Sequence, residues 1–188
     1  MKKAILLLAD GFEDVEAVTP IDYLRRAGID VVTVSISDSL TVTSRWGGIK
    51  LITDTLIKEH LTKSKKQPDW DAVIIPGGMP GAANIAASKE ANKLITELAS
   101  AGKAICAICA SPVVVLAPLG LLVGKKFTCY PGLEEKTTEG KWTSGSVVVD
   151  GNLITSRGAG TAGHFAIAVI EKLLDKAAAD KIADIVLL

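Results

Sequence analysis

Residues 103–112, with the sequence KAICAICASP, constrain the fold more than any other stretch because they join a buried strand to an abrupt helix start. The strand predicted over 103–108 is apolar on both alternating faces, which is typical of a strand covered on both sides in a parallel sheet. Ser111 is a candidate N-cap, with Pro112 at the first helical position. Cys109 is therefore predicted to lie at a strand-to-helix turn.

A thiol at such a turn faces unpaired backbone N–H groups and the positive end of a helix dipole, which both favour the thiolate. Cys109 is thus a candidate nucleophile that should ionise well below neutral pH, although free cysteines are often simply core residues. Cys106 and Cys109 have the spacing of a redox pair. Three extended residues span about 10 Å, however, which is beyond the reach of a disulfide. Cys106 is interpreted as a core residue, and Cys129 has no local signature.

Length and composition favour one domain over residues 1–188, because 48% of the 188 residues are hydrophobic and can fill one core. Basic and acidic residues number 21 each, so the overall charge predicts no binding to nucleic acid or to a membrane surface. The apolar run 4–9 is too short for a signal peptide and is interpreted as a buried first strand. Three cysteines without framework spacing indicate a reducing compartment, and the cytoplasm is the expected location.

Apolar strand patterns alternate with helical patterns along the chain, which predicts an open, mostly parallel α/β sheet with helices on both faces. The Asp150-Gly151 pair predicts a hairpin turn between the last two strands. The strands are expected at 4–9, 29–36, 70–75, 103–108, 127–130, 145–149 and 152–156, and helices at 82–88 and 90–101.

The first helix follows the turn at residues 10–11 and has acidic residues in its first turn, where the helix dipole favours them. Pro20, with Thr19 as a second cap, predicts a helix that is kinked or made of two pieces. Val15 and Val18, together with Tyr23 and Leu24, are expected on its buried side.

Ligands of open α/β sheets bind at the carboxyl ends of the strands, so the segments that follow those ends are expected to share one crevice. There, Cys109 would act as the nucleophile, and the N–H groups of Gly78 and Ala110 would stabilise an oxyanion. Glu16 would exchange a proton with the sulfur or the substrate. The segments are 10–16, 76–78, the turn at 109 and the loop 157–163.

Neither a dinucleotide site nor a catalytic histidine is favoured by the sequence. Gly158, Gly160 and Gly163 fit the G-x-G-x-x-G spacing of a dinucleotide loop, but no later strand supplies the acidic residue that binds the ribose. His60 and His164 are interpreted as surface or capping residues. No metal and no cofactor are expected.

Five motifs of the chain closely resemble the ThiJ/PfpI superfamily, and within it the branch of the parkinsonism-associated DJ-one protein and bacterial YajL. The motifs are ADGFEDVEAVTPID at 9–22, RRAG at 25–28, IPGG at 75–78, AICA at 107–110 and TSRG at 155–158.

The resemblance implies a flavodoxin-like homodimer in which a protonated Glu16 is hydrogen-bonded to a reactive Cys109. It also implies that Gly78 and Ala110 donate the oxyanion N–H groups, and that Arg26 and Arg45 lie near the pocket or the dimer seam.

The activities implied by the resemblance are a glutathione-independent glyoxalase, a deglycase acting on methylglyoxal adducts of thiols and amines, and an oxidative-stress role. The partners would then be small reactive aldehydes or glycated adducts. The alternative is a redox-sensing chaperone that is switched by oxidation of Cys109. Tyr130 stands where the animal branch has the histidine assigned to the glyoxalase reaction. Ala110 stands where protease-type members have histidine, which argues against a cysteine peptidase.

Overall fold

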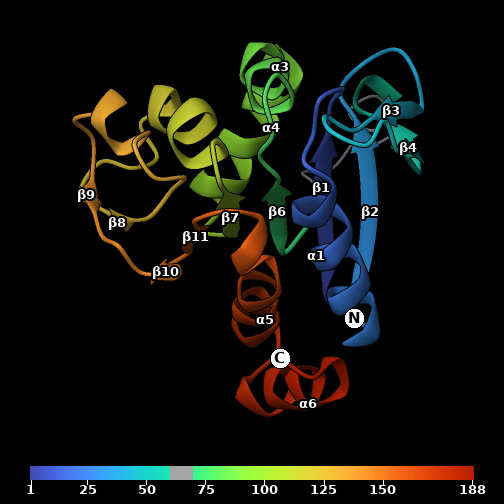
Figure 1. Ribbon diagram of the computed structural model, residues 1–188, viewed down its shortest axis with the longest axis vertical. Helices are drawn as coiled ribbons and strands as arrows, with labels where there is room; N and C mark the ends of the chain where they lie inside the picture. Colours follow the sequence, from blue (N-terminus) through green and yellow to red (C-terminus); the bar gives the residue numbers. More distant parts are fainter. Residues whose placement is uncertain (60–69) are drawn as a thin grey trace.

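The computed structural model describes residues 1–59 and 70–188, and a seven-stranded sheet is its central feature (Figure 1). The strands are β1 (Lys3–Leu8), β2 (Asp30–Ser35), β5 (Thr55–Leu56), β6 (Ala72–Ile75), β7 (Ala104–Ile108), β10 (Val147–Asp150) and β11 (Leu153–Ser156). They follow the order β10-β11-β7-β6-β1-β2-β5, and only the β10–β11 pair of this sheet is antiparallel. The predicted open, mostly parallel α/β sheet is thereby confirmed. His60 lies outside the described residues.

Helices cover both faces of the sheet, as predicted (Figure 1). Because alternate residues of a strand point to opposite faces, Leu6 and Leu8 join one core, whereas Ile5 and Leu7 join the other. This double burial explains why the central strands are apolar throughout. One face carries α1 (Asp14–Arg26), α5 (Ala162–Leu173) and α6 (Lys176–Val186); the other carries α3 (Gly81–Ala87), α4 (Lys89–Ser100) and the π-helix η1 (Pro112–Leu116).

Shorter elements surround this three-layer core. The predicted hairpin at Asp150-Gly151 is confirmed, with Gly151 at a φ of 66° between β10 and β11. The strand predicted over 127–130 is shorter than expected: of these four residues, only Phe127 lies in a strand, β8 (Lys126–Phe127). The short elements are β3 (Thr41–Thr43) paired with β4 (Lys50–Ile52), β8 (Lys126–Phe127) paired with β9 (Lys141–Trp142), and the 3-10 turns η2 (Ala117–Leu119), η3 (Glu134–Lys136) and η4 (Ala159–Thr161).

The structure corrects two expectations for α1. Of the two alternatives predicted for Pro20, a kink or a division into two pieces, the division is wrong, because one helix runs from Asp14 to Arg26 through a buried Pro20. Val15 and Val18 are 47% and 48% exposed instead of buried. The buried stripe follows a spacing of about four residues and includes Glu16, Pro20 and Leu24. α1 therefore carries a carboxyl group into the protein and two valines on its surface.

The structure also corrects the role expected of Ser111. An N-cap residue needs extended backbone angles, whereas Ser111 has a φ of −64° and a ψ of −33° and caps nothing with its side chain. Its buried hydroxyl instead donates to the carbonyl of Pro76 at 2.7 Å. Ser111 thus ties the segment after β6 to the segment after β7.

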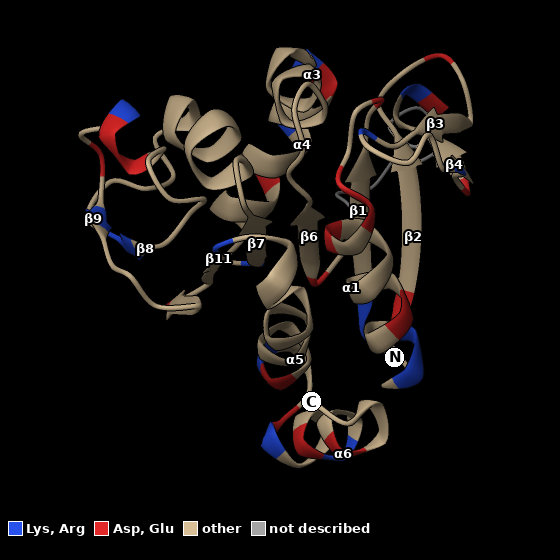
Figure 2. Cartoon of the chain, in the orientation of Figure 1, with Lys and Arg blue, Asp and Glu red and all other residues tan. Residues whose placement is uncertain are grey.

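Charged residues of both signs are distributed over the outer parts of the molecule, and the central strands are nearly free of them (Figure 2). The beginning of α1 is a local exception, with Asp14 and Glu16 in its first turn and Glu13 as its N-cap. Among the residues that the structure describes, no helix is both long and apolar enough to cross a bilayer.

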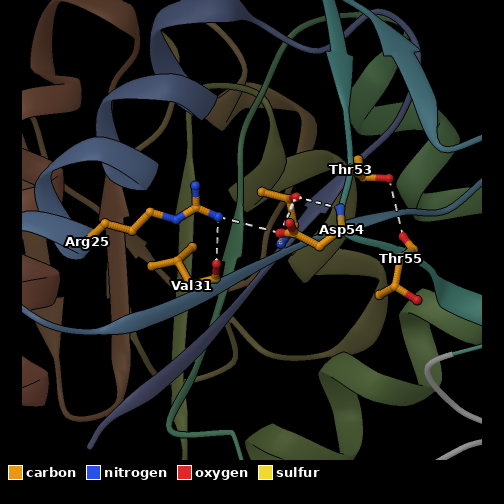
Figure 3. A network of polar contacts seen from close by, with 6 residues as sticks. Arg25, Val31, Thr53, Asp54 and Thr55 are labelled. Carbon is orange, nitrogen blue, oxygen red and sulfur yellow. Dashed lines mark hydrogen bonds and ion pairs between the residues drawn. The ribbon is translucent and has the colours of Figure 1, made fainter.

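A polar network around Asp54 fixes the outer edge of the sheet (Figure 3). Its carboxylate accepts hydrogen bonds from the Thr33 backbone N–H at 2.8 Å and from the Thr33 hydroxyl at 2.7 Å. Arg25 donates to the Val31 carbonyl at 2.9 Å and to Asp54 at 3.5 Å. A hollow of about 570 Å³ beside this network lies at the start of β2, at the amino ends of the strands. The candidate site lies at the opposite, carboxyl ends.

Candidate active site

Cys109 directly follows β7 and adopts a left-handed backbone conformation, with a φ of 65°. A non-glycine residue at positive φ is uncommon and persists only where its surroundings hold it. Two backbone hydrogen bonds do so here: the Cys109 N–H donates to the Ser156 carbonyl at 2.9 Å, and its carbonyl accepts the Tyr130 N–H at 2.8 Å. The predicted turn between β7 and a helix is therefore present, and neighbouring segments of the chain hold it in place.

Glu16 reaches Cys109 from the other side of the site. Only 1% of Glu16 is exposed, and its Oε2 accepts the Gly77 N–H at 2.9 Å, while its carboxyl is hydrogen-bonded to the Cys109 thiol. A Cβ atom on Gly77 would lie 2.6 Å from the Cys109 Cβ and 2.7 Å from the Glu16 Oε2. Only glycine at position 77 allows these two side chains to approach each other.

Two backbone N–H groups complete the surroundings of the sulfur, and they belong to the two residues that the sequence argument proposed as oxyanion donors. The N–H groups of Gly78 and Ala110 both hydrogen-bond to the Cys109 side chain. Gly78 has a φ of 86°, and a Cβ there would lie 2.5 Å from the Gly11 carbonyl oxygen. The turn after β6 is therefore packed against the turn after β1, which brings the carboxyl ends of three strands together.

The pKa of Glu16 is strongly raised by its surroundings. Burial raises it from 4.5 to about 7, and the charge of nearby Glu13 acts in the same direction. Hydrogen bonds from the Cys109 thiol and from the backbone N–H groups of Gly77 and Ala159 oppose this rise, because they stabilise the carboxylate. Glu16 therefore changes its protonation state close to neutral pH.

The pKa of Cys109 is raised as well, which contradicts the expectation of a thiol that ionises well below neutrality. Burial raises it from 9.0 to about 12, an ionised Glu16 adds to the rise, and the N–H groups of Gly78 and Ala110 oppose it. The sequence-based argument counted the N–H groups and the helix end but left out burial. The first proton of the pair thus leaves from Glu16, whose carboxylate then accepts a hydrogen bond from the thiol.

A pocket of about 470 Å³ opens above this pair. The structure brings together here five of the six site residues that the sequence singled out, including Arg45, whose guanidinium lies 4.4 Å from the ring centre of Trp46. Arg26 does not line this pocket and instead pairs with Asp22 at 2.8 Å on the exposed side of α1. The lining residues are Glu13, Glu16, Arg45, Trp46, Gly78, Met79, Cys109, Ala110, Tyr130, Leu133 and Ala159.

The sequence argument placed the loop 157–163 at this crevice but gave Ala159 no role, and it did not single out Trp46, Met79 or Leu133. The spacing of the glycines around Ala159 directed attention to a nucleotide, whereas the loop lies beside Glu16 and supplies an N–H group to it. Its position after β11, at the same carboxyl edge as Cys109, is the reason the loop was expected here, but that position does not indicate which of its N–H groups faces Glu16. His164 is exposed in the first turn of α5 and does not line the pocket.

The other two cysteines are buried free thiols, and Cys109 is the more accessible one. Burial raises the pKa of Cys106 above its ordinary value and raises that of Cys129 to about 12. Cys106 and Cys109 are both unpaired, as the extended geometry between them required. Within residues 1–59 and 70–188, no three His, Cys, Asp or Glu side chains are grouped so that they could hold a metal ion.

The chain is similar in sequence and structure to proteins of one family. The model of the DJ-1/PfpI family matches residues 2–172. Protein DJ-1 homolog B of Arabidopsis thaliana is 42% identical over 165 residues, which cover 88% of this chain and 36% of the plant protein. The chain thus spans about a third of the length of that relative.

Two further relatives match over nearly their whole length. The glutathione-independent glyoxalase DJR-1.2 of Caenorhabditis elegans is 33% identical over 175 residues, covering 92% of this chain and 89% of the nematode protein. The structure of oxidized Toxoplasma gondii DJ-1 aligns with a TM-score of 0.93 at 37% identity, covering 100% of this chain and 98% of that one.

Proposed function

The chain belongs to the DJ-1/PfpI family, and we propose that it converts small 2-oxoaldehydes such as methylglyoxal to 2-hydroxy acids without glutathione. One observation carries this proposal: the Cys109 thiol, a buried Glu16 carboxyl with a pKa of about 7 and two backbone N–H donors meet at one pocket. The name of the nematode relative, a glutathione-independent glyoxalase, supports the same assignment.

The first step is the addition of sulfur to the aldehyde. The Cys109 sulfur forms a bond to the aldehyde carbon while the Glu16 carboxylate accepts the thiol proton. The electron pair of the carbonyl π bond moves to oxygen, and the N–H groups of Gly78 and Ala110 stabilise this oxyanion. Glu16 then returns the proton to the oxygen, which gives a hemithioacetal.

The second stage moves a proton between the two carbons of the substrate. The Glu16 carboxylate removes the proton from the former aldehyde carbon while the neighbouring ketone oxygen takes up a proton, which gives an enediol. Glu16 then returns its proton to the neighbouring carbon as the hydroxyl on the sulfur-bearing carbon loses its own, which leaves a thioester of the hydroxy acid on Cys109. Water hydrolyses the thioester to lactate and the free thiol. One carbon is oxidised and its neighbour is reduced, so the reaction balances without a cofactor, a metal or an external oxidant.

The same chemistry extends to glycated adducts. A hemithioacetal or aminocarbinol formed by methylglyoxal on another thiol or amine releases the aldehyde reversibly, and Cys109 would capture that aldehyde. The pocket has a volume of about 470 Å³ and its lining includes Arg45, Trp46 and Leu133, which supports access for such adducts. We place deglycation in the same proposal as glyoxalase activity because both require the addition at Cys109.

A second candidate function is a redox-sensing chaperone switched by oxidation of Cys109. The observation that favours it is the difference in burial, since Cys106 and Cys129 are buried and Cys109 is partly exposed. An oxidant that reaches the molecule meets Cys109 first, and a protonated Glu16 could donate a hydrogen bond to the oxidised sulfur.

The direct test measures lactate from methylglyoxal in the wild type and in Cys109→Ser. We expect the Ser variant to lose all measurable turnover and Cys106→Ser to keep nearly all of it, because Cys106 lies inside β7 and away from the pocket. Lactate formation that persists in Cys109→Ser contradicts the assignment. If the wild type forms no lactate but suppresses the aggregation of client proteins after treatment with mild peroxide, and not before it, the chaperone function replaces the glyoxalase proposal.

We also propose that two copies of the chain associate as a homodimer and that the protein acts in the cytoplasm. The support for the dimer is the apolar surface of α1 at Val15 and Val18, together with the 75% exposed Ile52 of β4. Apolar side chains that are exposed on a helix and a hairpin favour a protein–protein contact.

A further inference from the structure

Two hydroxyl groups connect the turn η4 to the end of β11: that of Thr161, the last residue of η4, and that of Ser156, the last residue of β11. The Oγ atom of Ser156, which is fully buried, lies 2.7 Å from the Oγ1 of Thr161 and 2.9 Å from the carbonyl oxygen of Ser146. The Gly158 N–H donates to the Thr161 Oγ1 at 3.1 Å. The Thr161 hydroxyl also lies within hydrogen-bond distance of the Gly158 carbonyl oxygen, at 2.8 Å, so its one proton is shared between Ser156 and Gly158. Polar contacts therefore connect the Gly158 backbone through both hydroxyls to the Ser146 carbonyl.

These polar contacts lie beside both reacting groups of the proposed site. A Cβ on Gly158 would lie 3.8 Å from the Glu16 Oε1, so the backbone of the turn passes directly next to the carboxyl. The next residue, Ala159, supplies its N–H to Glu16. The Ser156 carbonyl accepts the Cys109 N–H at 2.9 Å. The same hydroxyl pair thus fixes the turn that faces Glu16 and the strand end that holds Cys109.

We infer that Thr161 is a positioning residue of this site: its hydroxyl, paired with Ser156, holds the Ala159 N–H against the Glu16 carboxyl and thereby influences which of Glu16 and Cys109 keeps their shared proton. The inference rests on the proposed pairing of Cys109 with Glu16. Thr161 itself does not line the pocket and acts through Ala159.

The electrostatic consequence has a definite sign. An N–H group that donates to a carboxylate stabilises the charged form, so its withdrawal raises the pKa of the carboxyl. The other titratable groups that act on Glu16 are the Cys109 thiol and the Glu13 carboxylate, and the lining of the same pocket also includes Arg45. The Thr161 hydroxyl is hydrogen-bonded to Ser156 and Gly158 and not to these groups, so a shift in the titration reports on the backbone that the hydroxyl pair holds.

The experiment compares Thr161→Val, which keeps the shape and removes the hydroxyl, with Thr161→Ser, which keeps the hydroxyl. In the full chain, the rate of Cys109 alkylation by iodoacetamide is followed from pH 5 to 9 by mass spectrometry of the Cys109 peptide. We expect a wild-type midpoint near 7, where Glu16 loses its proton. Thr161→Val should move the midpoint up by roughly half a pH unit or more, and Thr161→Ser should restore it.

Matched variants separate this effect from a general loss of stability. Thr96→Val removes an exposed hydroxyl that donates to the Asn92 carbonyl at 2.7 Å on α4, and it should leave the midpoint unchanged. Ser156→Ala removes the partner of Thr161 and should shift the midpoint in the same direction as Thr161→Val. If Thr161→Val does not fold, Thr161→Ala and Ser156→Ala decide the question.

An unchanged midpoint in the folded variants without the hydroxyl overturns the inference, as does a Thr161→Ser shift as large as that of Thr161→Val. Alkylation requires no methylglyoxal, so the two proposals fail separately. A wild type without lactate formation overturns the glyoxalase assignment alone, whereas the midpoints test Thr161 alone.

Discussion

Glu16 and Cys109 show how burial decides the chemistry of individual residues at this site. Both groups prefer their neutral forms in the folded protein, because burial raises both pKa values. Near neutral pH the carboxyl therefore exchanges its proton while the thiol keeps its own. A thiol of this kind becomes a nucleophile when the neighbouring carboxylate removes its proton during attack, which makes Glu16 as necessary to the proposed reaction as Cys109.

The raised pKa of Glu16 also predicts how stability depends on pH. The folded protein holds this proton up to about pH 7 and the unfolded chain only up to about 4.5. The stability from this group is therefore fully present below pH 4.5 and is lost as the pH rises through 7. Glu16→Gln cannot titrate and should lack this loss. Between pH 5 and 8, the unfolding free energy of the wild type should fall by about 2 to 3 kcal/mol relative to the variant.

Urea unfolding at several pH values measures this difference. Other titrating groups, such as Asp71 with its lowered pKa, are present in both proteins and cancel in the comparison. Parallel stability profiles for the wild type and Glu16→Gln would show that the carboxyl keeps an ordinary pKa. The proposed proton exchange with Cys109 at neutral pH would then have no basis.

At the scale of elements, the site is formed by turns that follow parallel strands and pack directly against each other. The turn after β1 approaches the segment from the end of β6 to the first residue of α3 through backbone atoms, which only glycine permits. A Cβ on Gly81 would lie 2.7 Å from the Phe12 backbone nitrogen and 2.8 Å from the Gly11 carbonyl carbon. The position of Gly78, and hence of its N–H group, depends on this contact.

Gly81→Ala should therefore be destabilising, because rigid backbone atoms face the added methyl group and cannot move aside easily. We expect a loss of about 1 to 3 kcal/mol in unfolding free energy, the usual range for overpacking. The matched control is Gly47→Ala, whose methyl group would lie 3.5 Å from an Ile49 side-chain carbon, an ordinary contact. Thermal or urea unfolding compares the two variants, and equal stability would show that the two turns separate at little cost.

Sequence patterns predicted the elements better than their orientation about their own axes. The central strands were identifiable because both of their faces are buried, and the shared crevice followed from the carboxyl ends of parallel strands. The rotation of α1 was predicted only in part: Glu16 was expected beside Cys109 and is buried there, but Val15 and Val18 were expected to be buried and are exposed. Contacts between distant segments, such as the Ser111 hydroxyl with the Pro76 carbonyl, have no local signature.

On the scale of the whole molecule, the exposed valines of α1 are relevant to association, because a second copy of the chain could bury them. A helix that turns a carboxyl inward and apolar side chains outward is stabilised when a second surface covers those side chains. The charges of the molecule are balanced overall, with 21 basic and 21 acidic residues, so net charge opposes no association between two copies. These features support the proposed homodimer.

The oligomeric state of the wild type and of Val18→Asp tests this proposal. Analytical ultracentrifugation should find the wild type at twice the 19.6 kDa mass of the chain. Val18→Asp should shift the population toward the monomer, because a carboxylate would lose its hydration in the interface. Val123→Asp is the matched control, since Val123 is 64% exposed in a turn remote from α1 in sequence, and it should remain dimeric. If the wild type is monomeric, or if both variants dimerise equally, Val18 does not lie in a dimer interface.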